Sequence, residues 1–170
     1  LPILQRLSQN KSKQNQNPSV LILAPTRELA IQLHKNAEIF SEAVARSACL
    51  LVGGLSVLTL KEALTLKPEI VVATPGRLLD HLRRNHLNLS GIQYLVLDEA
   101  DRMLDMGFLP DIRNILTHCS EPRQSLLFSA TLSDEIHLLA QKLLKRPILI
   151  EVNANRDAGS IEQKVFRVPE

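Results

Sequence analysis

The chain has 170 residues, which is long enough for one domain with a substantial core and too short for two domains of ordinary size. Its hydrophobic content of 45% and charged content of 22% exclude a disordered or fibrous protein, and its net charge of +2 excludes a strong overall attraction to nucleic acid. The longest uncharged run, residues 47–60, is interrupted by two glycines and is shorter than the roughly 18 residues of a membrane span, so no membrane partner is expected.

The first residues predict the end of a helix followed by a loop. Leu1, Leu4 and Leu7 have the spacing of an amphipathic helix, and the polar residues 9–17 predict a surface loop. The chain starts without Met and without the charged and apolar regions of a signal peptide. We therefore expect it to be a piece cut from a longer protein.

Six short apolar runs predict strands, and the helical patterns between them predict an α/β fold with a mostly parallel sheet and helices on both faces. The runs are residues 20–24, 48–52, 70–73, 95–97, 125–128 and 148–152. The helix after the first run is expected to bury one apolar stripe, made of Leu29, Leu33, Ala37, Phe40 and Val44.

Two of the strand ends carry a similar arrangement, with a Thr at the N-cap of a helix, a neighbouring Pro and an Arg in the first turn. The free backbone N–H groups of such a helix start can hold an anion. Each Arg is either an ordinary first-turn residue or a phosphate contact, and two such ends on one sheet edge favour a shared row of phosphates. The residues are Pro25, Thr26, Arg27, Thr74, Pro75, Gly76 and Arg77.

The second strand ends in the pair Gly53 and Gly54. Paired glycines permit a positive φ or the close approach of a foreign backbone. The pair is therefore either a plain turn, which is the simpler interpretation, or a surface on which a sugar-phosphate chain lies.

The fourth strand ends abruptly in Asp98, Glu99 and Asp101. An Asp just past a buried strand can hold Mg²⁺, usually through water, and a Glu beside it can orient or deprotonate an attacking water. This is the Walker-B half of a nucleotide-hydrolysing site. The alternative is a strand-to-helix turn with Asp98 as the N-cap and acids favoured by the helix dipole.

The fifth strand ends in Ser129, Ala130 and Thr131. Small hydroxyl groups at this position either satisfy local backbone groups or form hydrogen bonds with the acidic cluster. Both interpretations are compatible with the residues alone.

The cysteines and histidines show no metal-binding or disulfide pattern. Cys49 lies in an apolar strand-like run and Cys119 at the end of a helical one, and buried, reduced thiols favour an intracellular, cytoplasmic protein. We assign no histidine to a metal or to catalysis, because His34 lies in a predicted helix and the others lie among surface-type residues: His81, His86, His118 and His137.

Taken in order, these motifs resemble those of the first RecA-like domain of DEAD-box ATP-dependent RNA helicases. The matching segments are residues 25–30 with Gln32, the pair 53–54, and residues 74–77, 98–101 and 129–131. Residues 74–79 and 98–108 are particularly similar to the bacterial RhlE-type branch. The resemblance covers residues 1–152 as a partial RecA-like domain, and residues 153–170 resemble the start of a linker to a second RecA-like domain.

The resemblance implies roles for these residues. Asp98 would hold the Mg²⁺ of bound ATP, Glu99 would activate the hydrolytic water, and Asp101 would link to Ser129 or Thr131 and couple hydrolysis to domain closure. The two helix starts and the glycine pair would contact the sugar-phosphate backbone of RNA without reading its sequence. The second RecA-like domain of the same protein would complete the site.

The family's glutamine motif and its glycine-rich phosphate loop, with the strand that leads into it, are not found in these 170 residues. We expect this piece alone to be inactive, with the strand missing between the one that ends at Ser129 and residues 148–152. Three alternatives are a non-catalytic RNA-binding or interaction module, a metal-dependent hydrolase, which lacks a nearby His ligand, and a DNA helicase, which only the resemblance disfavours.

Overall fold

The computed structural model describes residues 2–9, 17–42, 46–54 and 57–152. The predicted linker at 153–170, the greater part of the predicted loop at 9–17 and Val44 lie outside the described residues. Within these ranges no helix is both long and apolar enough to cross a membrane.

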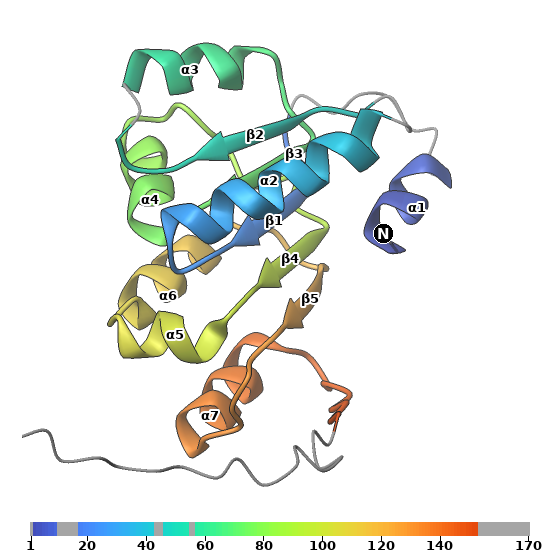
Figure 1. Ribbon diagram of the computed structural model, residues 1–170, viewed down its shortest axis with the longest axis vertical. Coiled ribbons are helices and arrows are strands. Elements are labelled where there is room, and N and C mark those ends of the chain that lie inside the picture. The colour runs from blue at the N-terminus through green and yellow to red at the C-terminus, as the bar shows by residue number, and fades with distance from the viewer. Residues whose placement is uncertain (1, 10–16, 43–45, 55–56, 153–170) are drawn as a thin grey trace, which may run out of the picture.

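A sheet of five parallel strands forms the centre of the molecule, in the order β2-β3-β1-β4-β5 (Figure 1). This result confirms the predicted α/β class and five of the six predicted strands. The strands are β1 Val20–Leu23, β2 Ala48–Leu51, β3 Ile70–Ala73, β4 Tyr94–Leu97 and β5 Gln124–Leu127.

Seven helices are described, and several begin and end where the local sequence predicts. Ser133 caps the last of them by accepting a hydrogen bond from the N–H of Ile136, and Gly107 follows another with a φ of +76°. The helices are α1 Pro2–Gln9, α2 Arg27–Glu42, α3 Val57–Thr65, α4 Pro75–Arg83, α5 Ala100–Asp105, α6 Leu109–Thr117 and α7 Asp134–Leu143.

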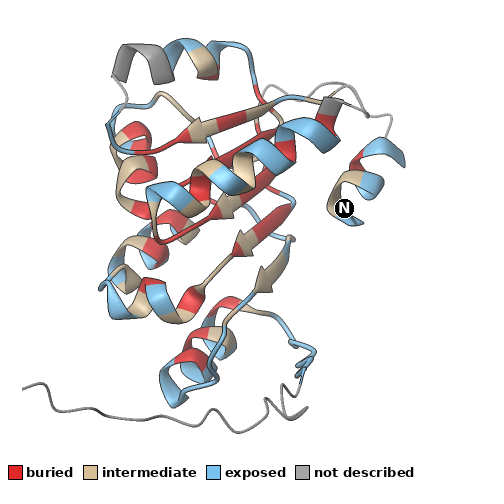
Figure 2. Ribbon diagram, viewed as in Figure 1, coloured by how far each residue is buried: buried red, intermediate tan, exposed pale blue. Residues whose placement is uncertain are grey.

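Successive side chains of the strands point to opposite faces of the sheet, and each face has its own apolar core. On one face Val20, Val72 and Tyr94 pack with α1 and α2. On the other face Leu21, Leu95 and their neighbours pack with α3 to α7. The central strands are therefore buried on both sides, as the colouring in Figure 2 shows, and the predicted three-layer arrangement is confirmed.

The helix that follows the central strand, β1, packs on the opposite face of the sheet from the helices that follow the two adjacent strands. The helix after β1 is α2, whereas the helices after β3 and β4 lie on the opposite face. In open α/β sheets, such a reversal opens a crevice at the carboxyl ends of the strands, where ligands bind. The order of strands and helices alone therefore favours a ligand site at the carboxyl ends of the strands.

Two predictions about apolar residues are wrong. The sixth predicted strand, residues 148–152, is not a strand, and Ile148, Ile150 and Val152 are each more than 80% exposed. A strand needs a neighbour for its backbone hydrogen bonds, and in the described parts of the chain none pairs with this segment. Phe40 is also exposed, at 43%, whereas Ser41 next to it is buried and takes the core-facing position of α2.

His81 is buried on α4, which corrects its predicted place among surface residues. Its Nδ1 lies 3.4 Å from Nδ1 of His86, and its Nε2 has no hydrogen-bond partner within the described residues. Burial lowers the pKa of His81, and the nearby positive groups of His86, Arg77 and Arg84 lower it further, while Asp80 opposes them. The folded protein therefore favours a neutral imidazole here.

We predict that acid destabilises the fold through His81. Its folded-state pKa lies below the ordinary value of 6.5, so the unfolded chain takes up the proton first as the pH falls. The contribution of neutral His81 to the free energy of unfolding is fully present above about pH 6.5 and is lost as the pH falls below this value. Urea unfolding between pH 8 and pH 5 should show this loss, and His81→Gln should flatten the profile. His137→Gln, at an exposed position on α7, is the control and should leave the slope unchanged.

Candidate functional site

The predicted site residues follow the carboxyl ends of the five strands. Because all the strands are parallel, these ends lie at one edge of the sheet. Residues 24–27 follow β1, Gly53 and Gly54 follow β2, Thr74 follows β3, Asp98 follows β4 and residues 128–131 follow β5. The structure therefore brings all five predicted segments to the same edge.

The acidic turn after β4 is anchored to both neighbouring strands. The N–H of Asp98 donates to the carbonyl of Leu23, and the N–H of Ala100 donates to the carbonyl of Phe128. Between them, Glu99 has a φ of +50° and a ψ of 55°, a left-handed conformation that costs a non-glycine residue about 1–3 kcal/mol. The two backbone hydrogen bonds on either side of Glu99 hold the chain in this turn. They therefore fix the directions of the Asp98 and Glu99 side chains.

Asp98 and Glu99 differ in their surroundings. Burial raises the pKa of Asp98, and the charge of Glu99 raises it further, while a hydrogen bond from the N–H of Glu99 to Oδ1 opposes both. The Glu99 side chain is 42% exposed, and its carboxylate lies 3.3 Å from the guanidinium of Arg102. Two adjacent half-buried acids, one of them with a raised pKa, suit a metal contact next to a group that meets water.

The N-cap alternative for Asp98 is wrong. Glu99 is the N-cap residue of α5, and its side chain makes no capping hydrogen bond. The Asp98 carboxylate accepts a hydrogen bond only from the adjacent N–H of Glu99 among the described residues. Its second oxygen is available to a ligand.

Asp101 joins the turn after β4 to the turn after β5. Its Oδ2 accepts hydrogen bonds from the N–H of Ala130 at 3.1 Å, the N–H of Thr131 at 3.0 Å and the Thr131 hydroxyl at 3.1 Å. Burial alone would raise the pKa of Asp101, but hydrogen bonds from the N–H of Arg102 and from Thr131 outweigh it and lower the pKa. The Ser129 hydroxyl donates to the carbonyl of Thr131.

The first helix start is built as the sequence predicts, with one addition. Thr26 Oγ1 accepts a hydrogen bond from the N–H of Leu29, so it caps α2. Arg27 Nη1 donates to the carbonyl of Gly53 at 2.5 Å, which connects the turn after β1 to the turn after β2. Gly54, with a φ of +83°, leaves room for this guanidinium.

The second helix start differs from the first. Thr74 occupies the N-cap position of α4 and Pro75 follows it, but the Thr74 side chain makes no capping hydrogen bond. Its hydroxyl is therefore available to a ligand. Arg77 lies 3.6 Å from Asp80, a partner that we did not predict although the i,i+3 spacing on a helix signals such a pair.

In the described residues no group of three or more His, Cys, Asp or Glu side chains could hold a metal ion. A magnesium ion at Asp98 would have to complete its coordination with water and with oxygens of a bound phosphate. This fits the half-buried carboxylate of Asp98, since Mg²⁺ usually retains several waters.

A solved structure shares this arrangement of strands and helices. The yeast DEAD-box splicing factor Prp28 superposes with a TM-score of 0.78 at 35% sequence identity, over 85% of this chain and 36% of that chain. The domain is therefore RecA-like. Residues 1–139 match the DEAD/DEAH box helicase family, and the chain belongs to this family as a first RecA-like domain.

Two curated relatives, both eukaryotic proteins, show how similar the chain is to known helicases. The chain is 45% identical over 170 residues to the probable ATP-dependent RNA helicase DDX27 of Mus musculus, which covers 99% of this chain and 22% of that protein. It is 41% identical over 174 residues to the ATP-dependent RNA helicase DRS1 of Mycosarcoma maydis, covering 99% of this chain and 19% of that protein. The chain thus spans about a fifth of these relatives, and they do not confirm the predicted RhlE-type branch.

We predict that Gly54→Ala destabilises the protein more than Gly53→Ala. A Cβ on Gly54 would lie 2.0 Å from Arg27 Nη1 and would force a left-handed φ on alanine, whereas a Cβ on Gly53 meets no atom within 4 Å. The left-handed conformation alone costs about 1–2 kcal/mol. Urea unfolding should show a loss larger than this for Gly54→Ala, because the clash adds to the backbone cost, and a loss of about 0.5 kcal/mol or less for Gly53→Ala.

The Arg27→Ala background separates the two causes. There the clash is absent and only the backbone cost of Gly54→Ala remains, so the loss should become smaller. Equal losses for the two glycine variants would contradict this account of the turn.

Proposed function

We propose that the parent protein is an RNA-dependent ATPase that uses ATP hydrolysis to bind RNA and to open short duplexes locally. The observation that carries the proposal is the convergence of five family motifs on one sheet edge, with the turn after the acidic strand hydrogen-bonded to the turn after β5. The relatives bear the name ATP-dependent RNA helicase, which agrees with this activity. We infer an intracellular, cytoplasmic location from the two free, buried cysteines.

We assign the nucleotide chemistry to the turn after β4. Asp98 would hold Mg²⁺ through water, and the metal would neutralise charge on the ATP phosphates. Glu99 orients and deprotonates the attacking water, with Arg102 beside it as a counter-charge. The glycine-rich loop that would hold the phosphates in this family is not among these 170 residues, so this piece alone should be inactive.

We assign the coupling of hydrolysis to domain closure to the link between Asp101 and Thr131. A charged acceptor with three donors resists separation, so a shift of the acidic turn moves the turn after β5 with it. Ser129 supports the same turn through its bond to the Thr131 carbonyl. The second RecA-like domain would then receive the movement.

RNA would lie along the turns after β1, β2 and β3. The groups available there are the guanidinium groups of Arg27 and Arg77, the Thr74 hydroxyl, and backbone at the glycines and prolines. Such groups bind phosphates and sugars and do not read base edges, so binding should be independent of sequence. The full set is Pro25, Thr26, Arg27, Gly53, Gly54, Thr74, Pro75, Gly76 and Arg77.

The alternative is a non-catalytic RNA-binding or interaction module. The motif GxxxxGK[ST] in the full-length protein would favour the ATPase, because that loop supplies the amides and the Lys that hold the β- and γ-phosphates. Its absence from the full-length protein would favour the module.

We predict that Glu99→Gln in the full-length protein lowers single-turnover ATP hydrolysis by about 10²- to 10⁴-fold and leaves ATP binding unchanged. The amide keeps the shape of the side chain but cannot accept a proton from water. Quenched-flow hydrolysis and titration with labelled ATP measure the two effects separately. Glu135→Gln, at an exposed position of α7, is the matched control and should hydrolyse ATP at the unaltered rate. Unchanged hydrolysis in Glu99→Gln would remove Glu99 from this role.

We also predict that Arg27→Ala and Arg77→Ala weaken RNA binding by similar factors for all sequences. Each lost phosphate contact should lower the slope of log affinity against log salt by about one unit. Fluorescence anisotropy with two unrelated oligonucleotides at several salt concentrations measures both quantities. Arg6→Ala, on an exposed position of α1, should leave the slope unchanged. A loss confined to one oligonucleotide would contradict backbone binding.

A further inference from the structure

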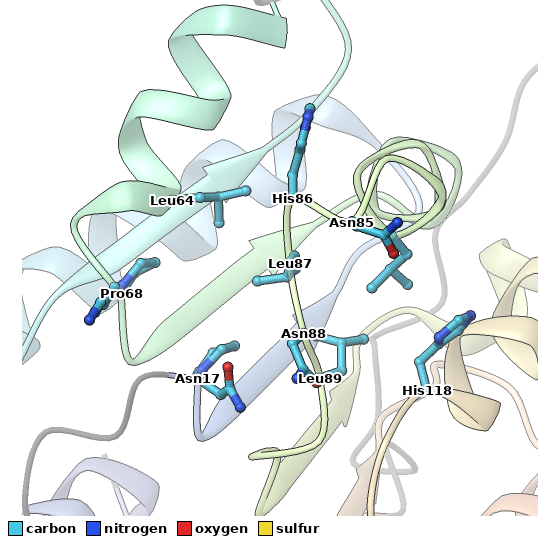
Figure 3. Close-up of a pocket in the computed structure, with 12 residues that line it drawn as sticks. Asn17, Leu64, Pro68, Asn85, His86, Leu87, Asn88, Leu89 and His118 are labelled. Atoms are coloured by element: carbon cyan, nitrogen blue, oxygen red, sulfur yellow. The ribbon is translucent and has the colours of Figure 1, made fainter.

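A pocket of about 490 Å³ lies at the amino ends of the strands, opposite the edge that carries the family motifs. Its walls are the residues that precede β1, β3 and β4, the ends of α3 and α4, and the turn after α6 (Figure 3). This volume is in the range of pockets that bind small molecules or a few residues of a peptide. The proposed function gives it no role.

The floor of the pocket is apolar and buried. It is made by side chains from four separate segments, so it is part of the core rather than a surface groove. These residues are Pro18, Leu64, Pro68, Leu82 and Leu89. An aliphatic side chain of a ligand would pack against this floor and would itself be removed from water.

The rim is polar and carries no carboxylate. Lys67 supplies a positive charge, two imidazoles supply N–H donors, and three carboxamides supply both donors and acceptors. The rim residues are Asn17, Lys67, Asn85, His86, Asn88 and His118. Arg83 and Arg84, both exposed, directly precede Asn85 at the end of α4. The rim is therefore complementary to a ligand with negative charge.

Two of the carboxamides are held in place by Ser90. Asn17 Nδ2 donates to the Ser90 hydroxyl at 3.3 Å, and Asn88 Oδ1 accepts from the Ser90 N–H at 2.8 Å. Gly91 allows this approach, since a Cβ there would lie 2.9 Å from the Asn17 side chain. Among the described residues, Asn17 Oδ1 and Asn88 Nδ2 have no partner, and these two atoms form the acceptor and the donor that a peptide group requires.

RNA is a poor match for this pocket. No Phe, Tyr or Trp is among the residues that line it, so there is no aromatic surface on which a base would stack. Only one lining residue, Lys67, has a permanent positive charge, whereas a row of phosphates needs several.

We propose that this pocket binds an acidic peptide segment of a partner protein. An aliphatic side chain of the peptide fills the floor, a peptide group bonds to Asn17 and Asn88, and flanking Asp or Glu residues face Lys67 and the basic end of α4. Because the pocket lies at the opposite edge from the turns assigned to ATP and RNA, the peptide and RNA bind together.

The test uses the full-length protein and two fluorescein-labelled pools of heptapeptides. Both pools carry Leu, Ile or Met at the centre, flanked by Asp and Glu in one pool and by Lys and Arg in the other. Fluorescence polarisation should show binding of the acidic pool only, also in the presence of saturating unlabelled oligouridylate. Lys67→Glu and His118→Glu, both at exposed positions, should each weaken binding about fivefold or more.

Lys61→Glu is the matched control, because it makes the same charge change at an exposed position of α3 that does not line the pocket. It should change affinity by less than about twofold. Equal binding of the two pools, no binding of the acidic pool, or an equal loss in Lys61→Glu would overturn the proposal. So would loss of oligouridylate affinity in Lys67→Glu, since the pocket would then be an RNA site.

Discussion

The register of the central strands is the constraint on which the site depends. In the parallel ladders Leu23 of β1 lies beside Ala73 of β3 and Leu97 of β4, so three strands end at the same level. The next residues of each strand therefore begin three different turns at one place. A shift of one residue in a strand would move each of its side chains to the opposite face, and because both faces are buried, side chains that fit one core would have to pack into the other. The core thus holds the functional edge in position.

Polar contacts then connect neighbouring turns along this edge. Arg27 joins the turn after β1 to the carbonyl of Gly53, and Asp101 joins the turn after β4 to the backbone and hydroxyl of Thr131. Each contact uses a charged group against neutral partners, which makes it stronger than an ordinary hydrogen bond. The strained backbone at Glu99 lies within one of these connected turns, the turn after β4. The edge is therefore a set of linked turns rather than five independent loops.

The sequence predicts the parts of this structure that local chemistry decides. Short apolar runs locate the five strands, and Thr26 caps its helix as expected. The errors involve interactions between distant residues. Nothing local in the sequence shows that His81 faces the core or that Phe40 faces solvent, since both depend on which face of the helix meets the sheet. The contact of Arg27 with Gly53 depends likewise on the order of the strands, which the residues near either position do not encode.

The open side of β5 has a consequence for how the molecule behaves in concentrated solution. β5 is the last strand of the described sheet, so one row of its N–H and C=O groups has no strand beside it within the described residues. Residues 148–152 add four exposed apolar side chains, three of them β-branched, with Glu151 as the one charge among them. An unpaired edge and a short segment with high β propensity favour strand addition between copies and the growth of aggregates. Glu151 is the one residue within that segment that opposes this self-association by charge.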